Sequence, residues 1–519
     1  MRKINAIILI GLVFCASCKK YFDINTNPND ATSATPELIL PQAITATAGN
    51  LNAYNTYGAQ LVGYMSNAGG YGGFGVSFTY NFTSSNWTGL WSGVYDNLED
   101  YQAILNRTGS VPAYSYFNAA ARIMKVLNFQ LLTDAYNDVP YDEALQGASK
   151  LTPVYTDAKS IYKDLASQLD TAISTINAGA TTVAVKPMGT SDALFGGNVT
   201  LWKKLANTLK LRLLIHAGNK VSFASTTFTS DGFLTTDALI DPGFVRDNNK
   251  QNPEWDQWTW SYSGSARGKA WMPATFIMAF YNGAKLADAG RGAATYYQFP
   301  STPTNTLGVE SNGVASSPEG SFWYPGADRG GTTAGNATGA LKGPDAGMPV
   351  ITAAESYFLQ AEGVVRGLIS SGNAQTLFNN GIATSFKYLY TKADGTVTGD
   401  PAADATTYIT NNNTSYLADF SKATTADQKI EAIITQKYIA LNMVNSDEAW
   451  NEYRRTHYPV LVNAAGATGT QTFASTSSES TRADRLPTRI VYPASEGAYN
   501  SSHLPKNISP FTSLIFWAQ

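Results

Sequence analysis

Apolar side chains recur every three or four positions in several separate stretches of the chain, which is the spacing of one face of an α-helix. These stretches run through residues 94–105, 117–131, 161–176, 202–213, 357–368, 378–389 and 430–441, and the last continues towards Trp450. Strand-like alternation is scarce, so any sheet is expected to be small and peripheral. Helices in sequential pairs predict an all-α, helical-repeat scaffold, although the tetratricopeptide consensus itself is absent.

Long polar segments interrupt the helical pattern and predict inserts at about 221–349, 391–426 and 461–484. The largest insert is rich in Gly, Ser, Thr, Trp and Tyr. Irregular loops of this length are uncommon in compact domains unless they bind something. We therefore expect the inserts to build one ligand face on the helical scaffold.

The amino terminus has the pattern of a secretory signal peptide over residues 1–17: a basic start, a short apolar stretch and small residues before Cys18. The apolar stretch is too short to span a bilayer, which needs about 20 residues. Ala16 and Ser17 before Cys18 are typical of a lipobox, so we expect cleavage before Cys18 and lipid on its thiol and new amino group. An ordinary signal peptide with an incidental Cys18 is the alternative.

The cysteine count favours the lipid anchor. Cys15 and Cys18 are the only two cysteines, so no disulfide can form in the mature chain. Two or more acyl chains on Cys18 would hold the protein stably at a membrane, whereas one chain would not. The predicted organisation is a signal peptide (1–17), a lipidated segment (18–35) and a single domain (36–519).

Composition narrows the class of partner. The 519 residues are 44% hydrophobic and 12% aromatic, which is ample for a large core. Charged residues make up only 14%, the formal net charge is −3, and Lys and Arg form no cluster, so nucleic acid is not an expected partner. A hydroxyl-rich surface with many aromatics is common in extracellular proteins that bind neutral ligands.

Metal and cofactor chemistry are not expected. The histidines His216, His457 and His503 are scattered, and His216 stands near a helix end, where a packing or capping role is the simpler interpretation. No metalloprotease motif, nucleophile elbow or phosphate loop is present. Residues 23–34 begin with the spacing of a calcium loop, but Pro28 replaces the required glycine and Ala34 the required glutamate.

Paired carboxylates leave a glycoside hydrolase as an alternative, because such enzymes need two. Glu355 and Glu362 would lie two helical turns apart on one face, and Asp134, Asp138 and Asp142 gather near a turn. Solvated or ion-paired carboxylates on helices are far commoner than catalytic ones.

Aromatic residues among Gly, Ser and Asn are the better candidates for ligand binding, because sugar rings stack on aromatic faces. If 255–260 were extended, Trp258 and Trp260 would share one side. The alternative is that many of these rings pack the inserts. The candidates are Tyr71, Phe74, Trp87, Trp258, Trp260, Trp323 and Tyr324.

An ordered set of motifs resembles the SusD/RagB family of outer-membrane nutrient-binding lipoproteins, in its branch with an Asn-rich amino terminus. Each motif alone is weak, but together they span nearly the whole mature chain. They are 22–29 (FDINTNPN), 35–38 (TPEL), 134–141 (DAYNDVPY), 202–212 (WKKLANTLKLR), 354–362 (AESYFLQAE), 448–456 (EAWNEYRRT), 485–489 (RLPTR) and 492–496 (YPASE).

The resemblance implies tetratricopeptide-like helix pairs with loop inserts that form the ligand face. It also implies a surface-exposed lid over a TonB-dependent barrel of the SusC type. Such a lid would capture a glycan, or in some relatives a peptide, and deliver it without hydrolysis. The shared motifs build helices and turns, so they assign no ligand-binding residue. A scaffold that binds only the barrel is a further alternative.

Overall fold

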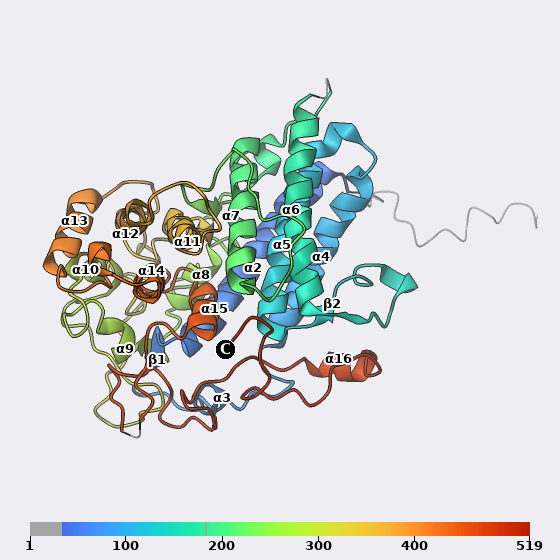
Figure 1. The fold of residues 1–519 in the computed structure, drawn as a ribbon. Coiled ribbons are helices and arrows are strands. Elements are labelled where there is room, and N and C mark those ends of the chain that lie inside the picture. Colours follow the sequence, from blue (N-terminus) through green and yellow to red (C-terminus); the bar gives the residue numbers. More distant parts are fainter. Residues whose placement is uncertain (1–33, 182–183, 465) are drawn as a thin grey trace, which may run out of the picture.

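The computed structural model describes residues 34–181, 184–464 and 466–519 (Figure 1). The predicted signal peptide, Cys18 and all but the last two residues of the 18–35 segment lie outside this range. Among the described helices, none combines the length and apolar character needed to cross a membrane.

The all-α prediction is confirmed, because helices dominate the described part of the chain and the strands are few and short. Three short helices lie inside the largest predicted insert: α8 (Pro253–Trp258), α9 (Thr275–Met278) and α10 (Ala289–Thr295). Two more short helices lie outside the predicted inserts: α3 (Val76–Thr79) and α16 (Ala494–Tyr499). The long helices are α2 (Pro36–Leu61), α4 (Thr88–Thr108), α5 (Ser115–Tyr136), α6 (Ala158–Ala180), α7 (Val199–Ala217), α11 (Ala353–Val365), α12 (Ala374–Tyr390), α13 (Pro401–Asn411), α14 (Ala426–Ala440) and α15 (Ser446–Thr456).

The long helices form two groups of neighbours. Helices α4, α5, α6 and α7 pack in chain order, and α11 packs with α12 and α14. Helix α7 contacts α11, and α2 contacts α4, α5 and α15, so α2 runs between the groups (Figure 1). The buried apolar side chains form one main cluster that extends from Ile39 to Ala518.

The sequence pattern does not predict helix α2. In its second half, polar and apolar side chains are buried alike. Thr47, Asn52, Asn55 and Gln60 are each at most 7% exposed, although they are polar. Every residue from Tyr54 to Leu61 is buried, and a helical segment surrounded on all sides does not show the one-sided pattern that identifies a surface helix. Pro36 at its first turn fixes where it begins.

The last apolar stripe, which is predicted to continue towards Trp450, is divided between two helices. Helix α14 begins at a capping box of Thr425 with Gln428 and ends at Ala440. Met443 then takes a left-handed backbone conformation (φ 58°), which an α-helix does not allow, and α15 starts as a separate helix at Ser446.

The described strands form three two-stranded antiparallel sheets, as the scarcity of alternation predicts. They pair β1 (Met65–Asn67) with β5 (Trp271–Pro273), β2 (Val139–Pro140) with β3 (Tyr155–Thr156), and β4 (Ala238–Ile240) with β6 (Met348–Ile351). The β1–β5 pair joins the segment after α2 to the largest insert. This pairing places aromatic residues from distant parts of the sequence beside each other.

A candidate ligand-binding face

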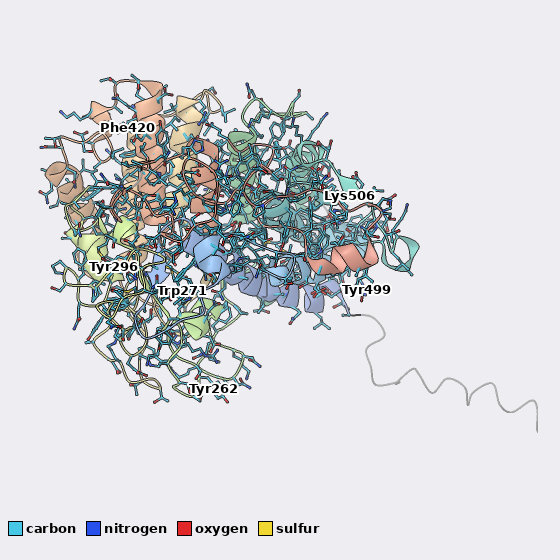
Figure 2. All side chains as sticks on the ribbon, turned by 90° about the horizontal axis from the view of Figure 1, so that it is seen from below. Tyr262, Trp271, Tyr296, Phe420, Tyr499 and Lys506 are labelled. Carbon is cyan, nitrogen blue, oxygen red and sulfur yellow. The ribbon has the colours of Figure 1, made fainter. Side chains whose placement is uncertain are left out.

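Phe74, Phe78 and Trp271 form a cluster of rings that we call the aromatic platform. The Phe74 ring stacks on Phe78 with 4.7 Å between centroids and 13° between planes. Trp271 of β5 stands edge-on to Phe74 at 5.4 Å and 82°. Tyr71, in the same loop as Phe74, is 43% exposed. Figure 2, which views the molecule from below, labels Trp271.

Backbone hydrogen bonds tie the platform loop to two other segments. Ala68 N donates to Ala270 O at 2.9 Å, and Gly69 N donates to Ala315 O at 2.9 Å. Only glycine fits at position 69, because a Cβ there would lie 2.1 Å from Val314 O. A Cβ on Gly72 or Gly73 would meet no atom within 4 Å, so this part of the loop borders open space.

Trp87 lies outside the platform. It precedes the first residue of α4 with a left-handed backbone (φ 59°), and its half-buried ring stands edge-on to Tyr57 at 5.3 Å. The structure thus brings Phe74 together with Phe78 and Trp271, neither of which is among the ligand-binding residues predicted from the sequence. The pairing of β1 with β5, which the sequence does not reveal, is what adds Trp271.

Four of the aromatic residues predicted to bind a ligand have buried rings, so the structure corrects their assignment. Trp258, Trp260, Trp323 and Tyr324 are each at most 3% exposed. Trp260 packs edge-on to Tyr324 at 5.2 Å, and Trp258 packs against Trp323 at 6.3 Å. Residues up to Trp258 form α8, so the side-alternation of an extended chain does not apply. These rings form the core of the insert and offer no face to a ligand.

A cleft of about 400 Å³ lies between α4, the loop before β3, and α16. Its apolar walls include Trp91, Tyr95 and two of the most exposed large apolar residues, Leu151 at 78% and Tyr499 at 79%. Figure 2 labels Tyr499. Three carboxylates and one lysine add polar groups to the lining: Asp96, Glu99, Glu496 and Lys150. The i, i+4 spacing of Trp91 and Tyr95 on one helix face was the available sequence signal.

The two glutamates considered for glycoside hydrolysis are buried and form hydrogen bonds or ion pairs. Glu355 accepts hydrogen bonds from Arg212 at 3.2 Å and Asn445 at 3.1 Å. Glu362 pairs with Arg366 at 2.6 Å and Arg455 at 2.8 Å. Both glutamates are 0% exposed, so neither can reach a glycosidic bond.

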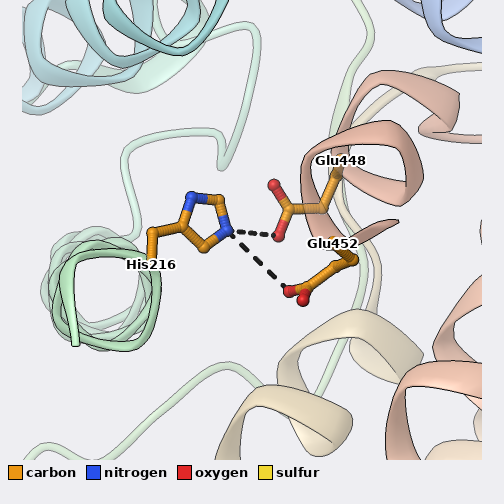
Figure 3. Close-up of side chains that lie close together, drawn as sticks. All are labelled: His216, Glu448 and Glu452. Atoms are coloured by element: carbon orange, nitrogen blue, oxygen red, sulfur yellow. Dashed lines mark hydrogen bonds and ion pairs between the residues drawn. The ribbon is translucent and has the colours of Figure 1, made fainter. Parts of the chain in front are cut away.

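His216 is neither a capping residue nor packed among apolar groups alone, because it joins a buried cluster of charges (Figure 3). His216 Nε2 lies 3.1 Å from Glu448 Oε1 and 3.8 Å from Glu452 Oε1. Burial alone would lower the pKa of His216, but the Glu448 carboxylate and hydrogen bonds to Asp134 and Glu448 raise it to about 9. The ring is therefore a cation at neutral pH.

The spacing of His216, Glu448 and Glu452 would also suit a metal ion. However, the ammonium of Lys437 lies 2.6 Å from Glu448 Oε1 and 2.7 Å from Glu452 Oε1. Lys437 thus holds the position that a metal would need, and His216 is protonated rather than free to coordinate. The cluster is an ion network between helices.

Two family models match this chain. One, described as "Starch-binding associating with outer membrane", matches residues 28–241. The other, described as "Susd and RagB outer membrane lipoprotein", matches residues 338–512. The chain belongs to the SusD-like family. These proteins bind nutrients at the outer membrane and are not enzymes, which removes the hydrolase alternative.

Solved SusD-like structures share the fold over nearly the whole chain. A chitin-binding SusD homologue of Flavobacterium johnsoniae is 22% identical, with a TM-score of 0.66 over 92% of this chain and 99% of its own. A SusD homologue of Bacteroides uniformis is 22% identical, with a TM-score of 0.65 over 93% and 99%. A SusD-like protein of the Bacteroidetes reaches a TM-score of 0.69 at 20% identity, over 94% and 100%. No curated protein matches the sequence.

Proposed function

We propose that this SusD-like protein is a lipoprotein, anchored through Cys18 to the outer membrane and exposed at the cell surface, that binds glycans on the aromatic platform. It would pass them to a TonB-dependent barrel of the SusC type. The observation that carries the proposal is the stacked pair Phe74–Phe78 with Trp271 at its edge, next to open space above Gly72 and Gly73. Such rings present apolar faces that complement the C–H faces of sugars.

Chitin oligosaccharides are the first probes, because one relative of the same fold is named as chitin-binding. Purified mature protein would be titrated with neutral oligosaccharides of several linkages. Tyr71→Ala, Phe74→Ala and Trp271→Ala should each weaken binding by about 1–3 kcal/mol, on the scale of single stacking contacts. Tyr262→Ala is the matched control for Tyr71→Ala, because both tyrosines are 43% exposed.

The platform proposal fails if no oligosaccharide binds, or if the platform variants bind as well as the Tyr262→Ala protein. A bound ligand at about 100 times its Kd should also stabilise the fold by about 2.7 kcal/mol, which gives an independent readout in thermal melts. Intact oligosaccharide after long incubation is the expected outcome of binding without hydrolysis.

The anchor has its own test. Cys18→Ser should release the protein from the outer membrane and abolish incorporation of labelled fatty acid, whereas Cys15→Ser should change neither. Surface exposure would be measured by protease accessibility of whole cells, and the barrel partner by co-purification in mild detergent. Retention of the lipid label in the Cys18→Ser protein would overturn the proposed anchor.

A peptide ligand is the second candidate, and the cleft beside α16 favours it. Asp96 and Glu99 line this cleft and form no ion pair or hydrogen bond within the described residues. Unpaired carboxylates beside Trp91 and Tyr499 suit a basic side chain, which can stack on a ring and pair with an acid. Binding of a lysine-rich peptide, lost in Tyr499→Ala, would favour this candidate over a glycan.

A further inference from the structure

Helices α4, α5 and α6 enclose a second cavity, of about 360 Å³, which we call the α4–α6 pocket. It shares no lining residue with the aromatic platform or with the cleft beside α16. Its volume is within the range of about 300–1,000 Å³ typical of small-molecule sites. Its chief polar lining residues are Gln102 and Asn106 from α4, Arg122 and Lys125 from α5, and Asp164 and Gln168 from α6.

Two cations in this pocket, Arg122 and Lys125, contact no carboxylate among residues 34–181, 184–464 and 466–519. Lys125 Nζ donates to Gln102 Oε1 at 2.5 Å. The Arg122 guanidinium donates to Gln168 Oε1 and, at 3.5 Å, to Asn118 Oδ1. Its Nε is buried and finds no acceptor in the described part of the chain. Both cations are half-buried and all their acceptors are neutral amide oxygens, although cations that lose contact with water are normally paired with an acid.

The pocket carboxylates do not neutralise these cations directly. Asp164 accepts hydrogen bonds from the Tyr141 hydroxyl at 2.5 Å and from Gln168 Nε2 at 3.1 Å, and it forms no ion pair with any described residue. Asp142 is exposed and accepts from Thr156 at 2.9 Å. Burial and the neighbouring charge of Arg122 lower the pKa of Lys125 to about 8. The carboxylates of Asp164 and Glu99 act in the opposite sense on Lys125 without contacting it, so a carboxylate bound between Arg122 and Lys125 would add the direct contact that both cations lack.

We propose that the α4–α6 pocket binds a small hydroxylated carboxylic acid, the chemistry of a sugar acid. The carboxylate would lie between Arg122 and Lys125, where a guanidinium can form two parallel hydrogen bonds with it. The amides of Gln102, Asn106 and Gln168 supply donors and acceptors for ring hydroxyls. The aromatic platform, by contrast, selects for stacking and contains no cation.

The probes are glucuronate, glucose and glucosamine, which are similar in size and carry a negative, a zero and a positive charge. In calorimetric titrations of the mature protein, glucuronate should bind at least tenfold more tightly than glucose, and glucosamine should bind least. Arg122→Gln and Lys125→Gln should each weaken glucuronate binding at least tenfold. Lys163→Gln, on the exposed face of α6, is the control and should leave binding unchanged.

Lys125→Arg keeps the charge and should retain glucuronate binding. If Lys125→Arg and Lys125→Gln have the same melting temperature, the loss of affinity in Lys125→Gln is not due to misfolding. Phe74→Ala, which alters the platform, should also leave glucuronate binding intact. The proposal is overturned if glucuronate does not bind, if glucose binds equally well, or if the Arg122 and Lys125 variants bind like the Lys163 control.

Discussion

His216 Nε2 lies 3.1 Å from Glu448 Oε1, which joins the end of α7 to α15 across 232 positions of sequence. Asp134 of α5 lies 3.6 Å from the other ring nitrogen, and Lys437 of α14 lies 2.6 Å from the same Glu448 oxygen. One buried carboxylate therefore holds cations from two helices of different groups. The network links the α4–α7 and α11–α14 groups through polar contacts as well as apolar packing.

Glu448→Gln should lower the free energy of unfolding by about 3–5 kcal/mol, because it leaves His216 and Lys437 as buried cations with one carboxylate fewer. Urea unfolding followed by circular dichroism measures the change. The control is Asp247→Asn, which breaks an ion pair with Lys250 whose side chains are 52% and 63% exposed. That change should lower the free energy of unfolding far less, because solvent screens an exposed ion pair. Equal costs for both variants would contradict the network.

The contribution of His216 should depend on pH. Its pKa is about 9 in the folded protein against an ordinary value of 6.5. A raised folded pKa gives stability that is complete below pH 6.5 and is lost as pH rises through 9. At about 1.4 kcal/mol per unit, the difference amounts to roughly 3 kcal/mol.

The measurement compares the wild type with His216→Gln in urea, from about pH 6 to about pH 9.5. The variant should be markedly less stable at the low end, and the gap should narrow as pH rises. Taking the difference between the proteins removes the titration of groups that both share. A gap that stays constant or widens with pH would show that His216 is not a cation in the folded state.

Two glycines of α2 should respond to alanine with opposite signs. A Cβ at Gly58 would lie 2.3 Å from Asp447 N and 2.4 Å from Ser446 O, so the start of α15 packs directly against this backbone. Gly58→Ala should cost about 1–3 kcal/mol or more, because backbone atoms cannot move aside easily. A Cβ at Gly49, in the same helix, would meet no atom within 4 Å, so Gly49→Ala should stabilise by up to about 1 kcal/mol.

Thermal and urea unfolding of both variants measure these changes. The pair shares one helix, one substitution and one change in helix propensity, so only the contact with α15 differs. A stabilising or neutral Gly58→Ala would mean that α15 does not approach α2 this closely.

The one-sided helices could be predicted from the sequence because their apolar stripes repeat at helical spacing, as in α4, α5 and α6. Helix α2 could not, since its polar residues Asn52 and Asn55 are buried by partners remote in sequence, such as Gln257 and Glu254. A pattern of hydrophobicity records which residues avoid water but not which polar groups find a buried partner. The same limit hid the role of His216, whose acidic partners come from α5 and α15.

The candidate site was predicted only in part, for a different reason. Tryptophan is both apolar and capable of hydrogen bonding, so the sequence WDQWTW around Trp258 fits a ligand platform and an insert core equally well. What separates Phe74 from Trp260 is solvent exposure, which depends on the pairing of β1 with β5 and on the path of the insert. The glycines flanking Phe74 and Tyr71 are the local signal that this loop borders open space.

Trp323→Ala and Tyr71→Ala should separate stability from binding. Trp323 is 0% exposed and packs against Trp258, so its loss should lower the free energy of unfolding by about 3–5 kcal/mol. Tyr71 is 43% exposed, so its loss should change stability by no more than about 0.5 kcal/mol while it weakens glycan binding. Urea unfolding and oligosaccharide titration of both proteins measure the two effects. Weakened binding in a Trp323→Ala protein that unfolds like the wild type would instead place Trp323 at the ligand.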